Sequence, residues 1–204
     1  MAEYAHAKDV YKELRDGLGP WTAANGFRRW PGTVAGWQRA AGTDQILRFM
    51  FEGSGRAGDP EMGNSLAGRL QLDPFPGDAA ATPIRQRAFS GCLVRPELDR
   101  LAAMQGAINQ RRPKLPAQFA ADFPADTLLG LYLREQYDPS PRYQEGQYVP
   151  FSYYGIEDVR EGIRFILDVL PAVLDRFVAG RTPRPIDTTP AHLKPKWLGG
   201  TRPR

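Results

Sequence analysis

Three glycines near the middle of the sequence have the spacing of a phosphate-binding loop. Gly53, Gly55 and Gly58 spell G-x-G-x-x-G directly after the run DQILRFMFE, which is typical of a β-strand. In a dinucleotide-binding fold such a loop leads at once into a helix, whose first amides meet the pyrophosphate. Here the turn pairs DP and GN follow, and then a second alternating run. We therefore predict a hairpin loop between two antiparallel strands.

The chain offers no other arrangement that is typical of catalysis. A kinase-type glycine loop needs a lysine on the next strand and an H-R-D segment. The next strand offers Arg69, and the two histidines, His6 and His192, lie near the chain ends. Cys92, the single cysteine, excludes an internal disulfide and is predicted to be a small buried residue. The sequence thus predicts no catalytic residues, no metal ligands and no cofactor, and we expect a protein that is not an enzyme.

Acidic residues beside the glycine loop raise the question of a bound cation. Glu52, Asp59 and Glu61 surround the loop, but they lack the D-x-D-x-D-G order of a calcium loop. We interpret them as charges on an exposed turn.

The spacing of the apolar residues predicts one helix followed by short strands. Residues 10–21 place apolar side chains on one helix face. Four strand-like segments follow between turn pairs: GFRRW, TVAGWQRA, QILRFMFE and, after the glycine loop, residues 66–72. Their alternation and short connections predict a four-stranded antiparallel meander with one covered apolar face.

Two further amphipathic helices are predicted in the second half of the chain. The first begins at Arg95, and the second, which is the strongest, covers residues 156–177, where Pro171 is expected to kink or split it. The segment RQRAFSGCLV before them fits a strand or a helical turn equally well. The predicted fold class is α+β: an N-terminal helix, the four-stranded meander, and C-terminal helices packed on one sheet face.

The charge distribution divides the chain into a body and a tail. The formal net charge is +4, but residues 181–204 carry six basic side chains and one acidic one, so residues 1–180 are close to neutral. The tail is also rich in proline and poor in apolar residues. We predict a single domain over residues 1–180 and a basic, proline-rich tail over residues 181–204.

A basic and aromatic cluster on the first strands is a possible ligand-binding site. Arg28, Arg29, Trp37 and Arg39 could stack on and pair with a nucleotide or an acidic peptide. Arginines next to strand aromatics are equally ordinary on a solvated sheet face, and both interpretations remain open.

Six of the eight tyrosines fall within residues 132–154. A tyrosine ring buries a large area at little entropic cost, so tyrosine-rich loops make good protein contacts. The alternative is that these rings cover the core and direct their hydroxyls to water. The predicted partner-binding residues are Tyr137, Tyr143, Tyr148, Tyr153, Tyr154 and, in the tail, Trp197.

The order of these segments resembles the domain of unknown function 4304 family, which consists of uncharacterised, largely bacterial proteins. The resemblance covers residues 8–75 and 150–178 and implies the α+β fold, but the family has no assigned activity to carry over. The residues that carry the resemblance are Leu14, Gly26, Phe27, Arg28, Arg29, Trp37, Arg39, Ile46, Leu47, Phe49, Ile156, Asp158 and Ile163.

Together these patterns favour non-enzymatic recognition of a protein partner, such as an immunity or regulatory role in a bacterium. A second hypothesis is nucleic-acid association through the basic tail, and a third is an unrecognised enzyme with a small-molecule cleft between the sheet and the later helices. The charged N-terminus and the lack of a long apolar run predict a cytoplasmic protein that does not bind membranes.

Overall fold

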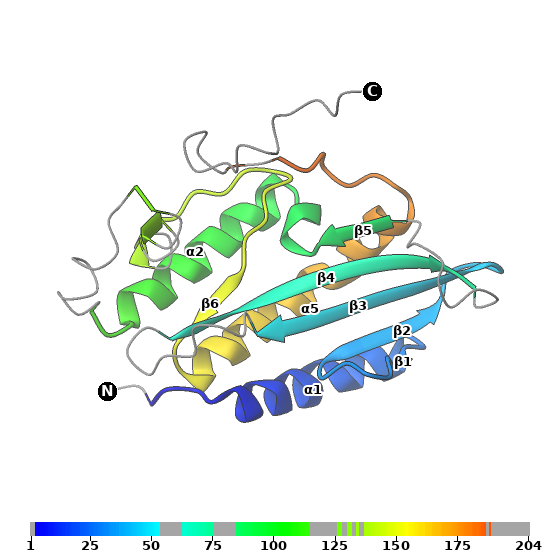
Figure 1. The fold of residues 1–204 in the computed structure, drawn as a ribbon, viewed down its shortest axis with the longest axis horizontal. Coiled ribbons are helices and arrows are strands. Elements are labelled where there is room, and N and C mark those ends of the chain that lie inside the picture. Colours follow the sequence, from blue (N-terminus) through cyan, green and yellow to red (C-terminus); the bar gives the residue numbers. More distant parts are fainter. Residues whose placement is uncertain are drawn as a thin grey trace, which may run out of the picture.

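The computed structural model describes residues 3–53, 63–75, 85–114, 126–127, 130–131, 134, 137–186 and 188. Three long helices and a six-stranded sheet make up these parts of the chain (Figure 1), which confirms the α+β class. The helices are α1 (Ala7–Ala24), α2 (Arg95–Arg111) and α5 (Ile156–Val178). The strands are β1 (Arg28–Arg29), β2 (Gly36–Ala40), β3 (Gln45–Gly53), β4 (Asn64–Pro74), β5 (Arg85–Ala88) and β6 (Phe151–Tyr153).

The predicted meander is confirmed as β1-β2-β3-β4, in which every neighbouring pair is antiparallel. Two further strands extend it. β6 pairs with the beginning of β4, and β5 pairs with its second half. The segment RQRAFSGCLV forms both of its alternatives in turn, first β5 and then the short 3-10 helix Ser90–Cys92.

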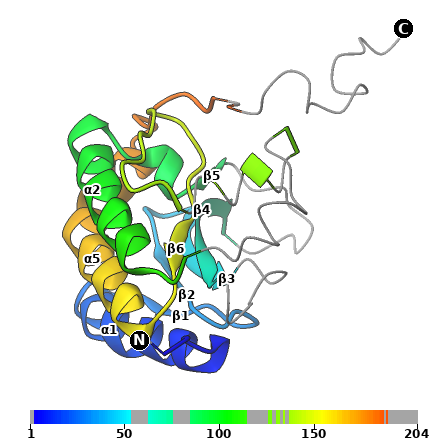
Figure 2. The ribbon, with the colours of Figure 1, turned by 90° about the vertical axis from the view of Figure 1, so that its left-hand side faces the viewer.

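All three helices lie on the same side of the sheet (Figure 2). The strand alternation follows from this arrangement, because successive side chains point to opposite faces. In β3, the side chains of Leu47, Phe49 and Phe51 enter the hydrophobic core under the helices. The residues between them point away from the helices, on the face that we call the outer sheet face. Its residues include Arg28, Gln38, Ala40, Ile46, Arg48, Met50, Glu52, Ala67, Arg69, Gln71, Asp73, Gln86 and Ala88.

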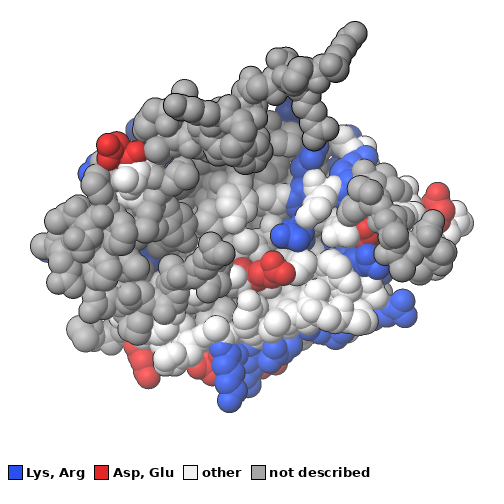
Figure 3. Space-filling view, in the orientation of Figure 1, with Lys and Arg blue, Asp and Glu red and all other residues white. Residues whose placement is uncertain are grey.

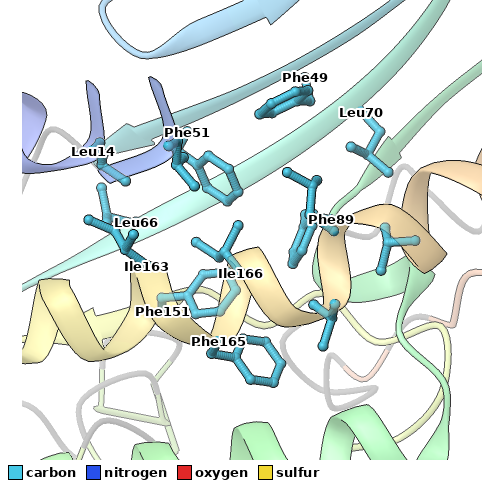
Figure 4. Close-up of a cluster of buried hydrophobic side chains, with 14 of the residues drawn as sticks. Leu14, Phe49, Phe51, Leu66, Leu70, Phe89, Phe151, Ile163, Phe165 and Ile166 are labelled. Atoms are coloured by element: carbon cyan, nitrogen blue, oxygen red, sulfur yellow. The ribbon is translucent and has the colours of Figure 1, made fainter. Parts of the chain in front are cut away.

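Aromatic rings from the sheet and from α5 dominate the core (Figure 4). The ring of Phe51 lies 5.5 Å from Phe89 and 6.3 Å from Phe151, and Phe151 lies 6.0 Å from Phe165, all as centroid distances. Edge-to-face and tilted contacts of this kind stabilise a core beyond the area that they bury. Between the sheet and the helices, the cavity lined by Leu66, Ile163 and their neighbours measures only about 10 Å³.

Helix α1 packs parallel to α5 through a tight contact at Gly17. A Cβ atom added there would lie 2.8 Å from a methyl group of Ile163. At the solvent side of the same contact, Arg160 donates hydrogen bonds to both carboxylate oxygens of Glu13, and this guanidinium lowers the pKa of Glu13. Helix α5 continues unbroken past Pro171, so the alternative that it splits there was wrong. Its buried face, which includes Leu170 and Leu174, holds both halves against the sheet.

Strand β6 is fixed by a side chain of α2. The Gln105 amide accepts a hydrogen bond from Ser152 N and donates one to Ser152 O, at 3.0 Å and 3.2 Å. This side chain thus serves as a strand partner on the edge of β6 that faces α2.

The predicted boundary at residue 180 is followed by a segment that contacts the body of the protein. Ile186 N donates a hydrogen bond to Gly146 O, and Gly146 has a φ of +80°. A Cβ atom at Gly146 would lie 1.8 Å from Arg184 O, so this close approach requires glycine.

Of the helices that the structure describes, none has the length and apolar character of a membrane span.

Candidate functional site

The glycine motif lies at a hairpin, as predicted, because β3 and β4 pair antiparallel on either side of it. Gly53, the last residue of β3, donates its amide hydrogen to the Tyr11 hydroxyl at 2.7 Å. The first amide of the motif is thus already used to join β3 to α1. Gly55 and Gly58 lie outside the described residues. The antiparallel pairing excludes the parallel βαβ unit that a dinucleotide fingerprint requires.

The four residues of the predicted basic and aromatic cluster do not share one site. Arg28 and Arg29 are neighbours in β1, so their side chains lie on opposite faces of the sheet. Trp37 is only 3% exposed and stacks on Phe49, and Arg29 covers its other ring face at 5.1 Å.

The remaining arginine contacts of this region are local. Arg29 donates hydrogen bonds to Thr33 O and Val34 O, while Arg39 donates one to Asn25 O and lies 4.5 Å from the ring of Phe27. Burial, with a smaller effect from Arg15, lowers the pKa of Arg29. Arg29, Trp37 and Arg39 therefore stabilise the sheet edge, and only Arg28 is left on the outer sheet face.

The predicted partner-binding tyrosines are divided between core and surface. Tyr143, Tyr153 and Tyr154 are buried, and Tyr137 is half-buried next to Arg112, whose guanidinium lies 5.0 Å from its ring. Tyr148 is 55% exposed. Trp197 lies outside the described residues. Of the five tyrosines, Tyr148 is thus the one placed to contact another molecule.

Polar side chains form a continuous row across the outer sheet face. The register of β1 to β5 aligns one residue from each strand. Figure 3 shows the molecule from this side, with Lys and Arg gathered beside a hollow. The row consists of Arg28, Gln38, Arg48, Gln71 and Gln86.

The middle of this row is held rigidly. Arg48 pairs with Asp73, donates a hydrogen bond to Gln38 at 3.0 Å, and lies over the ring of Trp30 at 5.1 Å. Gln71 donates a second hydrogen bond to Asp73 at 2.7 Å. The charge of Arg48 is therefore neutralised by Asp73 and is not available to a ligand.

Next to this network lies a surface hollow of about 480 Å³, which we call the Arg69 hollow. Arg69 and Glu52, both exposed, contribute opposite charges to its lining, yet neither side chain makes a hydrogen bond or ion pair with any residue that the structure describes. The small residues Ala67 and Ala88 leave room between them. The hollow is lined by Glu52, Ala67, Gly68, Arg69, Gln86, Arg87, Ala88 and Tyr148.

Sequence reasoning did not single out Arg69 as a candidate for a binding residue. Its position in an alternating run indicated a side chain on the exposed face, which is a signal that every strand gives. What sets Arg69 apart is the contrast with Arg48, which is ion-paired, and with Arg29, which is bonded to backbone carbonyls. This contrast depends on the neighbours of each arginine on adjacent strands, so it can be recognised only when the register of strand pairing is known.

The described residues offer no metal centre, since they contain no group of three His, Cys, Asp or Glu residues that could hold a metal ion.

Comparison of the chain with protein-family models, with curated proteins and with solved structures finds no match. The resemblance to the domain of unknown function 4304 family therefore stays a prediction.

Cys92 is buried, as predicted, and its environment suppresses thiol chemistry. Burial raises the pKa of the Cys92 thiol to about 12, against the weaker opposing effect of nearby arginines. Only about one thiol in 10,000 is then ionised at pH 8. We expect the native protein to resist labelling by a thiol-specific disulfide reagent at pH 8 and to react stoichiometrically once unfolded in guanidinium. Rapid stoichiometric labelling of the native protein would contradict this environment.

Proposed function

We propose that this chain is a non-enzymatic binding module that recognises an acidic protein partner through its outer sheet face. The observation that carries the proposal is an arginine on that face with no ion pair to any described residue: Arg69 is exposed in a hollow, while the neighbouring Arg48 is neutralised. Exposed arginine beside exposed tyrosine is the composition in which binding hot spots are enriched. An immunity or regulatory role of this module stays a prediction from the sequence.

The packing supports binding on the outer face more than a small-molecule enzyme under the helices. The buried cavity under the middle of the helices, lined by Leu66, Ile163 and their neighbours, measures about 10 Å³, whereas small-molecule sites measure roughly 300–1,000 Å³. A more open hollow of about 360 Å³ lies at the rim of this layer, between β2, β3 and the end of α5. The Arg69 hollow on the opposite face falls within that range. Most of the basic residues behind the nucleic-acid hypothesis belong to the tail outside the described residues.

Charge reversal on the two sides of the molecule tests the proposal. The protein and two variants, Arg69→Glu and Arg164→Glu, are used to capture proteins from a lysate of the cells that produce it. Arg164 is the matched control, because it is exposed on α5, on the helix side, and makes no hydrogen bond or ion pair with the described residues.

We expect one stoichiometric protein with the unchanged chain and with Arg164→Glu, and at least a tenfold loss with Arg69→Glu, since like charges across an interface cost several kcal/mol. The absence of any stoichiometric protein, or equal capture by both variants, would refute the proposed function.

A further inference from the structure

Resting on the proposed function, we propose that the Arg69 hollow is an anchor site for an Asp or Glu side chain of the partner. The carboxylate binds the guanidinium of Arg69 next to the amide of Gln86, and Glu52 on the other side weakens this binding by repulsion. This assigns the chemistry of the contact, which the proposed function leaves open.

Arg69 occupies the centre of the hollow by register. It pairs with Met50 of β3 and Ala88 of β5, and both of these neighbours lack a charge. Its own charge has no partner in the described structure, so binding an anion does not require an existing ion pair to be broken. A guanidinium offers two parallel N–H donors, which match the two oxygens of a carboxylate.

Gln86 and Glu52 lie on the two diagonals from Arg69 along the outer sheet face. Gln86 pairs with Gln71, two residues along β4 from Arg69, and Glu52 pairs with Ala67, two residues in the other direction. Diagonal neighbours on one sheet face are within reach of long side chains. A carboxylate held by Arg69 therefore has an amide donor on one side and a negative charge on the other.

The charge of Glu52 opposes the binding of any anion. Coulomb repulsion scales with the product of the charges, and a phosphate monoester carries about −1.5 to −2 at neutral pH, against −1 for a carboxylate. Glu52 thus repels a phosphate monoester almost twice as strongly, and Arg69 attracts it almost twice as strongly. The prediction of an acidic protein side chain rests instead on the match between the two parallel N–H donors of Arg69 and the two oxygens of a carboxylate.

The remaining lining accommodates the stem of such a side chain. Ala67 and Ala88 present only methyl groups, and Tyr148 adds an exposed aromatic side. Arg87 pairs with Leu70, a residue of the core face, so its side chain begins on the helix side of the sheet. It nevertheless lines the hollow, where it adds a second positive charge and donates a hydrogen bond to Gln86 O at 3.2 Å.

The test uses a defined probe, N-acetyl-glutamate α-amide, titrated into the isotope-labelled full chain and followed by NMR. We expect saturable shifts of the amides of residues 67–69 and 86–88. Arg69→Gln should weaken binding at least tenfold, whereas Glu52→Gln should tighten it about two- to fivefold by removing a like charge. Arg164→Gln serves as the control and should change nothing.

Two further probes separate the outcomes. The neutral N-acetyl-glutamine α-amide should not bind, and inorganic phosphate should gain more from Glu52→Gln than the carboxylate does, because it carries the larger charge. The inference is overturned if the carboxylate gives no saturable shift or if Arg69→Gln leaves its affinity unchanged.

These results can be told apart from a failure of the proposed function. If the chain captures a protein through Arg69 but does not bind the probe, the proposed function stands and the carboxylate anchor is refuted. If the chain binds the probe through Arg69 but captures no protein, the anchor stands and the proposed role as a protein-binding module is refuted.

Discussion

Replacing Asp158 by asparagine is expected to lower the free energy of unfolding by about 3 kcal/mol. One carboxylate oxygen accepts hydrogen bonds from the amides of Tyr154 and Gly155, at 2.9 Å and 3.0 Å, and the other accepts one from Arg111 at 3.0 Å. Both oxygens are therefore acceptors in a site that is only 9% exposed. An asparagine NH₂ group must face either two backbone donors or a guanidinium, and it satisfies neither.

The loss should appear as a fall of about 6–12 °C in the melting temperature, measured by calorimetry. Asp175→Asn is the matched control: Asp175 is exposed on the same helix, and its side chain makes no hydrogen bond or ion pair with the described residues. Equal stability of the two variants would show that Asp158 does not join β6 to the start of α5 in the way described.

Replacing Gly68 by valine is expected to destabilise the protein by about 2–3 kcal/mol, because it overpacks a closed core. A Cβ atom at Gly68 would lie 2.6 Å from the Cβ of Phe89 and 2.7 Å from a ring carbon of Phe51. Both rings are fully buried, so they cannot move aside without disturbing the contacts with Phe151. Urea unfolding measures the change as a lower midpoint at an unchanged slope.

The neighbouring residue provides the control for this substitution. Ala67→Val adds two methyl groups on the outer sheet face, where Ala67 lines the Arg69 hollow, and should change stability by less than about 0.5 kcal/mol. If Ala67→Val destabilised the protein as much as Gly68→Val, the assignment of the two faces of β4 would be incorrect.

The architecture could be predicted from the sequence wherever the residue pattern is local. Alternation in β3 and turn pairs between the first strands were sufficient for the meander, and helical spacing was sufficient for α1, α2 and α5. The pairing of β5 and β6 with β4 could not be predicted, since β6 lies more than 80 residues from its partner and has only three residues. Contacts of that range leave no periodic trace in a sequence.

The candidate site was predictable only in part, for the same reason. Arg28 and Arg29 stand next to each other in the sequence, which suggested one cluster, but strand geometry directs them to opposite faces. The tyrosines were also grouped by their closeness in the sequence. Tyr143 and Tyr153 were predicted to contact a partner, but they pack in the core. Arg69 gains its significance from the ion pairs that its neighbours make, and these are properties of the folded sheet.

The most direct test of the account is an arginine footprint of the complex isolated by affinity capture. The reactivity of each arginine toward phenylglyoxal is measured by mass spectrometry with and without the partner. Arg69 on the outer sheet face should be protected in the complex, while Arg164 on the helix side should react as in the free chain. Protection of Arg164 with Arg69 left reactive would contradict binding through the outer sheet face.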